Sequence, residues 1–535
     1  MKKNTILSIM TCAAMLLLTA ACSNDENSNP KEQPTQAVQF SFTNEDFGAD
    51  ETLSRATGAA ETKPQTVDLG DCEAEISVEN EPAVKTRGTM TNAVGHYTIR
   101  AYQGGTLKGE MKGTFSGGNF TPDASSRKSM SLSDGTYDFI AFNDDVIPSG
   151  NELTVTRDKA ATAMLGTTTE LINQHPDQKV NFTMKHVGCR LRTQFVCKKH
   201  IPENITAKLE QTVANAIPTH MTYNILTHAK TYTNGAMTAE NSNSPASTEA
   251  AYLASNFGQD YAYTSTSDYH YFLPTTEGSK LKLTFAAGTL FWKPLTGTIP
   301  QLNATLQMQA NKSYLVKIKI KPIYTYLMSD GSTGHFKDTT FGGGTKTPVG
   351  VVADPVARVA IALKNVSDVT EYLWSNTYTP AYNTTIYSST ETAKTDMEGY
   401  KWTWEAAGST DGTVKANHQT LYPAFYEAGH YNPGVPVSST LVNKWYLAGW
   451  GEWYMYVGKC LGFDEGATYY IYGVLLDESF TKVGGTKLTN ENYYLLSTQA
   501  KVKGNILPWS TAFTSIGRAT VGGGGYGIVR PFIKY

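Results

Sequence analysis

The residue best placed for covalent chemistry near the start of the chain is Cys22, which follows an apolar segment. Lys2 and Lys3 supply positive charge, Ile6–Leu18 is a short apolar run, and small residues lead to the cysteine. This order is typical of a secretory signal, and the run is too short to span a bilayer as a mature helix. A cysteine at this junction resembles a bacterial lipobox, so we expect Cys22 to be diacylated. The alternative is an ordinary signal peptide with an incidental cysteine.

Motifs for enzymatic catalysis are missing from the sequence. It contains no H-E-x-x-H, no G-x-S-x-G and no G-x-x-x-x-G-K-[ST]. Acid pairs such as Asp144-Asp145 and Asp464-Glu465 adjoin turn-like residues, so we interpret them as facing water. A glycosidase needs two acids that converge in a cleft. We therefore expect a protein that is not an enzyme and that carries no cofactor.

Composition limits the class of partner. The chain has 535 residues, 40% of them hydrophobic, and a net charge of −3, which indicates about three packed domains and gives no electrostatic basis for binding nucleic acid. Cys189 and Cys197 lie in one strand-like run, where they would be ~26 Å apart, too far for a disulfide. No cysteine pair has metal-binding spacing. We predict buried free thiols and no metal site.

Short alternating segments dominate residues 97–322. In Tyr314–Lys321 the apolar residues face one way and three lysines face the other, and Gly135–Phe142 follows an Asp-Gly turn. Many such runs separated by turn residues predict antiparallel β-sandwiches. Two earlier pieces, Ala37–Phe42 and Ala74–Val78, are also strand-like. Ala207–Ile217 has helical spacing and is a candidate for a short helix.

Residues 324–535 have a different composition. They hold seven of the eight tryptophans and 20 of the 31 tyrosines. A helix is predicted around Trp453 and Tyr456, so this part is expected to be an α+β module. We assign Trp445 and Trp453 to its core. Four other tryptophans are candidates for a surface that binds sugar or protein, although each could instead pack the core; they are Trp402, Trp404, Trp450 and Trp509.

Three stretches of residues 97–322 together resemble the fimbrillin family of Bacteroidales pilus subunits. Leu132–Phe142 carries a G-x-Y-x-F strand, Phe182–Leu191 carries an H-x-x-C-R strand, and Asn311–Ile318 carries an N-K-x-Y strand. The resemblance implies two tandem Greek-key, transthyretin-like β-sandwiches. Acidic residues just after Cys22 are compatible with export to the outer face of the cell.

The last 212 residues resemble a second family, the Fibrobacter succinogenes major paralogous domain, which is similar in plan to C-type-lectin-like folds. The matching stretches are Trp445–Trp453, Tyr494–Thr498 and Gly527–Phe532. The tripeptide motifs that bind calcium in such lectins, E-P-N and Q-P-D, do not occur in residues 324–535. The resemblance therefore implies a lectin-like module without a calcium site.

The fimbrillin resemblance also implies a mode of assembly. A trypsin-like protease removes the leader after an arginine, taking away one strand of the first sandwich, and a strand donated by a neighbouring subunit fills the groove. We prefer Arg87, followed by Gly88, because the cut would fall after Ala74–Val78. A cut at Arg55, followed by Ala56, would leave that piece in place. Alternatively, both are ordinary solvated arginines.

The leading interpretation is a structural and adhesive pilus subunit at the tip. Its module would bind a host or bacterial surface glycan or protein, its other partners would be pilus subunits, and it would pass from an outer-membrane lipid anchor to an extracellular fimbrium. The alternative is a glycan-binding lipoprotein that stays anchored at the outer surface. The expected divisions are 1–21 signal peptide, 22–87 lipidated leader with the removable strand, 88–184 first sandwich, 185–322 second sandwich and 323–535 lectin-like domain.

Overall fold

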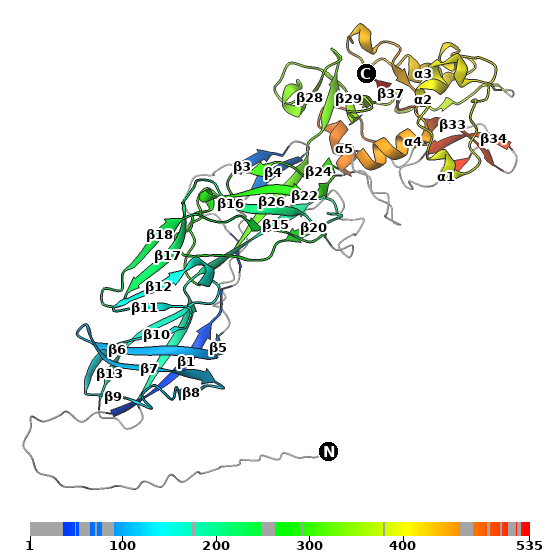
Figure 1. Ribbon diagram of the computed structural model, residues 1–535. Helices are drawn as coiled ribbons and strands as arrows, with labels where there is room; N and C mark the ends of the chain where they lie inside the picture. The colour runs from blue at the N-terminus through cyan, green and yellow to red at the C-terminus, as the bar shows by residue number, and fades with distance from the viewer. Residues whose placement is uncertain are drawn as a thin grey trace, which may run out of the picture.

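The fold is mostly β, and three β-rich parts follow one another along an elongated molecule (Figure 1). The computed structural model describes residues 36–48, 50–52, 65–69, 72–76, 90–173, 178–247, 263–291, 293–377, 380–460, 474–488, 493–502, 505–511, 520–521 and 526–535. The predicted class, β-sandwiches followed by a mixed module, is confirmed in its mostly β character. Most strand pairs are antiparallel, but three of those described below are parallel.

The first sandwich is a nine-stranded sheet with the order β5-β1-β14-β13-β10-β6-β7-β8, and β9 pairs with β1. The alternation of apolar and polar residues explains why these segments form strands with one buried face. In β14, for example, every second residue from Val180 to Met184 is buried, and the residues between them are exposed. The strands predicted near residues 97–102 and 135–142 are present. The bounds are β1 Gln36–Glu45, β5 Met90–Asn92, β6 Gly95–Gln103, β7 Thr106–Ser116, β8 Asn119–Pro122, β9 Met130–Leu132, β10 Gly135–Asn143, β13 Met164–Ile172 and β14 Lys179–His186.

A four-stranded sheet crosses the predicted boundary between the sandwiches at residue 184. Its order is β11-β12-β17-β18, so β12 from the first half pairs with β17 from the second. The helix predicted over 207–217 is wrong. Two strands, β16 and β17, flank a turn in which Asn215 has a left-handed φ of 57° and Val213 is exposed. The bounds are β11 Ile147–Ser149, β12 Glu152–Thr156, β16 Thr206–Gln211, β17 Ile217–Asn224 and β18 Lys230–Gly235.

The second sandwich packs a seven-stranded sheet, β20-β15-β26-β4-β3 with β2 on β26 and β21 on β15, against the four-stranded sheet β19-β16-β22-β25. In β26 the residues Val316, Ile318 and Ile320 are buried, as their alternation predicts. Cys189 and Cys197 are free and buried, which is also as predicted. The bounds are β2 Asp50–Thr52, β3 Gln65–Asp68, β4 Cys72–Ile76, β15 Cys189–Cys197, β19 Glu240–Asn241, β20 Tyr263–Thr266, β21 His270–Phe272, β22 Leu281–Ala287, β23 Thr289–Leu290, β24 Lys293–Pro294, β25 Thr298–Ile299 and β26 Ser313–Pro322.

The C-terminal module is built on a six-stranded sheet with the order β28-β27-β29-β30-β37-β32. The helix predicted around Trp453 is present as α4 followed by a π-helix, η8. The strands are β27 Thr325–Met328, β28 Thr333–His335, β29 Pro348–Asp354, β30 Val359–Ala362, β31 Tyr372–Leu373, β32 Trp445–Tyr446, β33 Tyr494–Val502, β34 Asn505–Thr511, β35 Thr520–Val521, β36 Tyr526–Gly527 and β37 Phe532–Lys534. The helices are α1 Thr390–Ala393, α2 Gly399–Trp404, α3 Pro423–Gly429, α4 Trp450–Glu452, η8 Trp453–Cys460 and α5 Val474–Thr481. The 3-10 turns are η1 Arg157–Lys159, η3 Gly278–Lys280, η4 Phe336–Asp338, η5 Ala406–Gly408, η6 Lys415–Asn417 and η7 Ser439–Leu441.

Helix α5 attaches the module to the second sandwich. Leu475 is buried in the hydrophobic core of that sandwich. The hydroxyl of Tyr324 donates to the Leu475 carbonyl at 2.6 Å, and the hydroxyl of Tyr326 donates to the Ser479 carbonyl at 3.0 Å. Because these hydroxyls are buried, breaking either bond would leave a polar group unpaired in the interior.

Candidate functional site: the groove filled by strand β1

Strand β1 is the first strand that the structure describes, and both of its edges are hydrogen-bonded. It runs parallel to β14, with Phe42 opposite Phe182. Its first residues, Gln36–Val38, pair antiparallel with β9, and its last residues, Thr43–Glu45, pair antiparallel with β5 on the edge opposite β14. Removal of a strand that is paired in this way leaves unpaired backbone groups on its neighbours.

The inner face of β1 is apolar. Val38 and Phe42 are buried in the core of the first sandwich, and Phe40 packs against it while remaining partly exposed. The ring of Phe42 stacks on Phe115 with 4.0 Å between centroids and meets Phe182 at 4.8 Å in an edge-on arrangement. Removal of β1 would therefore open a groove lined by aromatic side chains.

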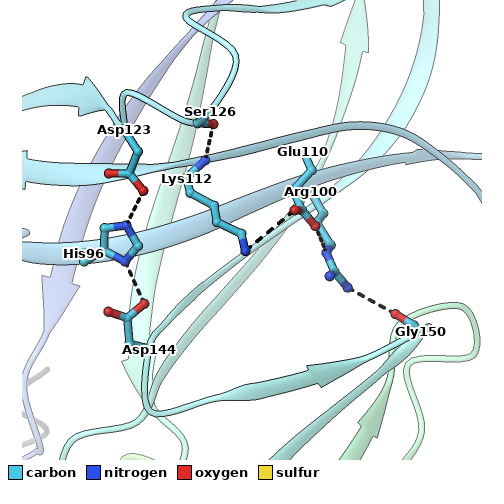
Figure 2. Close-up of polar contacts among 8 residues, drawn as sticks. All are labelled: His96, Arg100, Glu110, Lys112, Asp123, Ser126, Asp144 and Gly150. Atoms are coloured by element: carbon cyan, nitrogen blue, oxygen red, sulfur yellow. Dashed lines mark hydrogen bonds and ion pairs between the residues drawn. The ribbon is translucent and has the colours of Figure 1, made fainter.

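The sheet that contains β1 is also held by polar contacts that do not involve β1 (Figure 2). His96 on β6 lies between Asp144 at 2.7 Å and Asp123 at 3.0 Å, and these hydrogen bonds raise the pKa of its imidazole. On the same face Arg100 donates to Glu110 on β7 at 2.7 Å. These polar bonds tie β6, β7 and two turns together, so the sheet has support independent of β1.

The strand-like piece at residues 74–78 belongs to the second sandwich. It forms β4, which pairs antiparallel with β26, and Ala74 and Ile76 are buried in the second core. In Figure 1 the blue strands β3 and β4 lie beside β26 and apart from β1. The preference for Arg87 assumes that a cut there removes residues 74–78 as a strand of the first sandwich. Since this piece belongs to the second sandwich, its removal would not open the first.

Most of one edge of β26 is covered by segments from the start of the chain. Parallel strand β2 pairs with Ser313–Leu315, and β4 pairs with Ile318–Pro322. The opposite edge pairs with β15. The N-terminal segment therefore contributes to both sandwiches, through β1 in the first and through β2, β3 and β4 in the second. The predicted chemistry sites Cys22, Arg55 with Ala56, and Arg87 with Gly88 lie outside the described residues.

The structure buries two of the tryptophans proposed as a binding surface. Trp402 is 1% exposed and Trp450 is 3% exposed, so both pack the core and neither offers a face to a ligand. Trp404 is partly buried, and its indole N–H donates to the Trp445 carbonyl at 2.7 Å. The side chain of Trp509 lies outside what the structure describes. The assignment of Trp445 and Trp453 to the core is confirmed.

Two exposed tyrosines that sequence reasoning missed are better placed for contact. Tyr526 is 59% exposed and Tyr493 is 45% exposed. Their segments are adjacent, since the backbone N–H of Ile528 donates to the Tyr493 carbonyl at 2.7 Å. Composition alone did not distinguish them from the module's other tyrosines, because exposure depends on the fold.

Acidic side chains inside the module are structural. Glu452 accepts from the Tyr446 hydroxyl at 2.8 Å and from the Gly449 N–H at 2.8 Å, and burial raises its pKa to about 8. Asp396 accepts from the Trp402 indole at 2.9 Å, and burial also raises its pKa. Both carboxyls are fully enclosed by protein, so neither could meet a substrate.

Neither a metal-binding cluster nor a membrane-spanning helix is found in the described parts of the chain. Among those residues, no three His, Cys, Asp or Glu side chains are grouped so that they could hold a metal ion. No helix within those same ranges is long and apolar enough to cross a bilayer.

A family model matches the middle of the chain. Residues 73–334, just under half of the sequence, match the family model described as fimbrillin-like. This range covers most of both sandwiches and ends shortly after β26. No curated protein matches the chain.

Solved structures give weaker likenesses. A fimbrial protein from Bacteroides ovatus is 12% identical, with 94% of this chain and 100% of that chain covered and a TM-score of 0.23. A fimbrial protein from Bacteroides vulgatus is 12% identical over 45% of this chain and 93% of that chain, with a TM-score of 0.28. At these TM-scores the likenesses carry no argument about this protein's function.

Proposed function

We propose that this chain is a subunit of a cell-surface pilus that accepts a donated strand into the groove now filled by β1. The observation that carries the proposal is that β1 is paired along its whole length, with β9, β14 and β5, while burying Val38 and Phe42. A segment of this kind can be replaced by another extended strand with the same alternation, because backbone pairing gives affinity and side-chain pockets give register. The fimbrillin-like family match supports the same assignment.

The pairing of β4 favours Arg55 over Arg87 as the processing site. A cut after Arg55 would separate β1 and β2 from the rest and leave the β3–β4 hairpin on β26. A cut after Arg87 would also release that hairpin, exposing the edge of β26 and opening the second core where Cys72 and Ala74 are buried. A cut after Arg55 also frees β2 from Ser313–Leu315 but leaves the second core closed. We infer that this smaller opening is the economical product, so Arg55 is now the preferred site.

The C-terminal end is poorly suited to serve as a donor strand. Strand β37 lies between β30 and β32 in the six-stranded sheet of the module. Phe532 and Ile533 are both 0% exposed. We infer that this subunit accepts a strand and gives none, which corresponds to a position at the tip with the module facing outward.

The module is proposed as the adhesive part, in keeping with its predicted lectin-like plan. The exposed Tyr493 and Tyr526 are the preferred contact residues, because an exposed aromatic ring offers a large face to a sugar or a protein. The runner-up function is a glycan-binding lipoprotein that keeps its lipid anchor at Cys22. It would use the same module and would never lose β1.

N-terminal sequencing and intact-mass measurement of the protein from the surface of living cells test the proposal. A mature chain that begins at Ala56 supports strand exchange with processing at Arg55, and a start at Gly88 supports strand exchange with a larger released piece. A chain that retains an acylated Cys22 in its surface-exposed form would refute the pilus proposal and favour the anchored receptor.

A further inference from the structure

The N-terminal segment continues past β1 and enters the junction between the two sandwiches. Directly after β1, Phe47 is only 7% exposed. Its ring lies flat on the imidazole of His186, the last residue of β14, with 3.9 Å between centroids and an interplanar angle of 9°. The guanidinium of Arg190, on β15 of the second sandwich, lies 4.9 Å from the centre of the same ring. One side chain of the leader therefore contacts both sandwiches.

Backbone and amide contacts hold this crossing in register. Gly48 donates its N–H to the Asn311 carbonyl at 3.3 Å, and the Asn311 side chain accepts from the His186 N–H at 3.1 Å. Asn311 adopts a left-handed φ of 60°, a conformation that asparagine tolerates better than most residues. Asn311 thus receives the leader on one side and the end of β14 on the other.

Charge is also matched at the crossing. Glu45 lies 3.3 Å from the ammonium of Lys185, and Asp46 lies 3.5 Å from His186. Burial lowers the pKa of His186, and the nearby positive charge of Arg190 acts in the same direction, whereas Asp46 opposes it. The Phe47 ring therefore meets the flat imidazole of His186 and the cationic guanidinium of Arg190, surroundings that suit an aromatic side chain.

Space for a bound segment exists beside this position. A cavity of about 410 Å³ is lined by residues from both sandwiches, including Lys185, His186, Tyr223 and Asn311. We call the set His186, Arg190, Tyr271 and Asn311 the junction socket. The Tyr271 ring lies 5.8 Å from that of Phe47. In the uncut chain the socket is occupied by Phe47.

We propose that the junction socket is a second recognition site for the donated strand. It would select a donor that runs parallel to β14 and carries an acidic pair and then an aromatic residue just past the groove. This inference rests on the proposed strand exchange and adds a requirement to it: the donor must reproduce Glu45, Asp46 and Phe47 as well as the apolar face of β1. A donor of this kind would join the two sandwiches as well as fill the first.

The test uses the chain from Ser23 to Tyr535 with a site-specific protease sequence inserted after Arg55. After cutting, the bound leader is exchanged against a fluorescent synthetic peptide of residues 36–55, and the Kd is measured by anisotropy. Peptides with Phe47→Ala, Phe47→Tyr, Phe42→Ala and Gln39→Ala are compared. Gln39 is the matched control because it lies on β1 with its side chain exposed.

The Phe47→Ala peptide is expected to bind roughly 30-fold more weakly, as for truncation of a buried aromatic anchor. The Phe47→Tyr peptide should stay within about threefold of the parent, and Gln39→Ala should match it. Against cut protein that carries Arg190→Ala, the penalty of Phe47→Ala should shrink, since the partner is already lost.

The possible results separate the two proposals. If Phe42→Ala weakens binding and Phe47→Ala does not, strand exchange stands and the junction socket is wrong. If the Phe47→Ala penalty is the same with Arg190 and with alanine at that position, the ring does not act through the socket, and the inference also fails. If no peptide binds the cut protein, the proposal that β1 can be replaced by another strand is itself refuted.

Discussion

Replacing Phe42 by alanine should loosen the first sandwich as a whole. Phe42 is 4% exposed, and its ring packs against Phe115, Phe182 and Tyr97. Removal of a buried phenylalanine side chain costs about 3–5 kcal/mol in a well-packed core. We expect the lower end, about 3 kcal/mol, because β1 lies near the chain terminus and its neighbours can partly close over the gap. At 1.4 kcal/mol per tenfold, opening of the sandwich becomes roughly a hundredfold more frequent.

Hydrogen–deuterium exchange with mass spectrometry measures this loss of stability peptide by peptide. Peptides from β10 and β14 should exchange roughly a hundredfold faster in Phe42→Ala, while peptides from β29 and β30 in the C-terminal module should be unchanged. Gln39→Ala, on the outer face of the same strand, is the control and should stay within about threefold of the parent. If the two variants exchange alike, β1 is not an integral part of the first core, and its removal would not open a groove there.

Three further perturbations test other parts of the molecule. Gly188→Ala should lower the unfolding free energy of the sandwiches in urea by at least about 2 kcal/mol, because the new Cβ would lie 2.1 Å from the Ala160 carbonyl oxygen. An unchanged unfolding free energy would mean that the backbone at the junction can shift to make room. Ile533→Asp should unfold the module, seen as loss of protection from proteolysis after residue 324, because it buries an unpaired carboxylate; retained protection would contradict a central β37. The module's unfolding free energy, followed by tryptophan fluorescence, should fall by about 1.4 kcal/mol per pH unit as pH rises from about 6.5 to 8. Burial raises the pKa of Glu452 to about 8 in the folded state, whereas the pKa of Asp477 is raised only to about 6, so Asp477 acts mainly below this range. Glu452→Gln should flatten the slope between about pH 6.5 and 8, and an unchanged slope there would assign it to another group.

Alternation in the sequence located strands well but could not name their partners. The pieces at 37–42 and 74–78 were both recognised as strands from their pattern. The pattern says which side chains share a face, while the partner strand is set by long-range packing. Strand β1 pairs with β14 about 140 residues away, and β4 pairs with β26 about 240 residues away. The choice between Arg55 and Arg87 depended on this missing information.

The failure of the helix prediction over residues 207–217 has a specific physical cause. Leu209, Val213 and Ala216 are spaced as on one helical face, but Leu209 lies in β16 while Val213 is 58% exposed in the following turn. Pairing of β16 with β22 outweighs weak local helix preference. Similarly, tryptophan content predicted an aromatic-rich module correctly, but which rings are buried depends on packing that composition does not encode.

The energetics of the C-terminal end give the polarity of the proposed assembly. Ile528, Val529, Phe532 and Ile533 are each at most 1% exposed, and full burial of such side chains stabilises by about 1.5–3 kcal/mol each. The Arg530 between them is buried too, with its guanidinium donating to Asn365 at 3.0 Å and to the Thr486 carbonyl at 2.6 Å. Pulling this segment out would cost about 6–12 kcal/mol in apolar burial alone, comparable to the whole stability of a domain.

In the proposed assembly the N-terminal end differs, because a cut would convert β1 from part of the chain into a ligand. Once the covalent link is broken, a competing strand needs only to exceed the affinity of the released leader, since equivalent backbone pairing is restored in the same groove. The C-terminal strand has no such exchange partner, because leaving its sheet would unfold the module that holds it. If β1 is replaceable as proposed, the chain has one strand that it can exchange and one that it cannot release. Such a chain would support growth in a single direction, which is the basis for proposing that it ends the fibre.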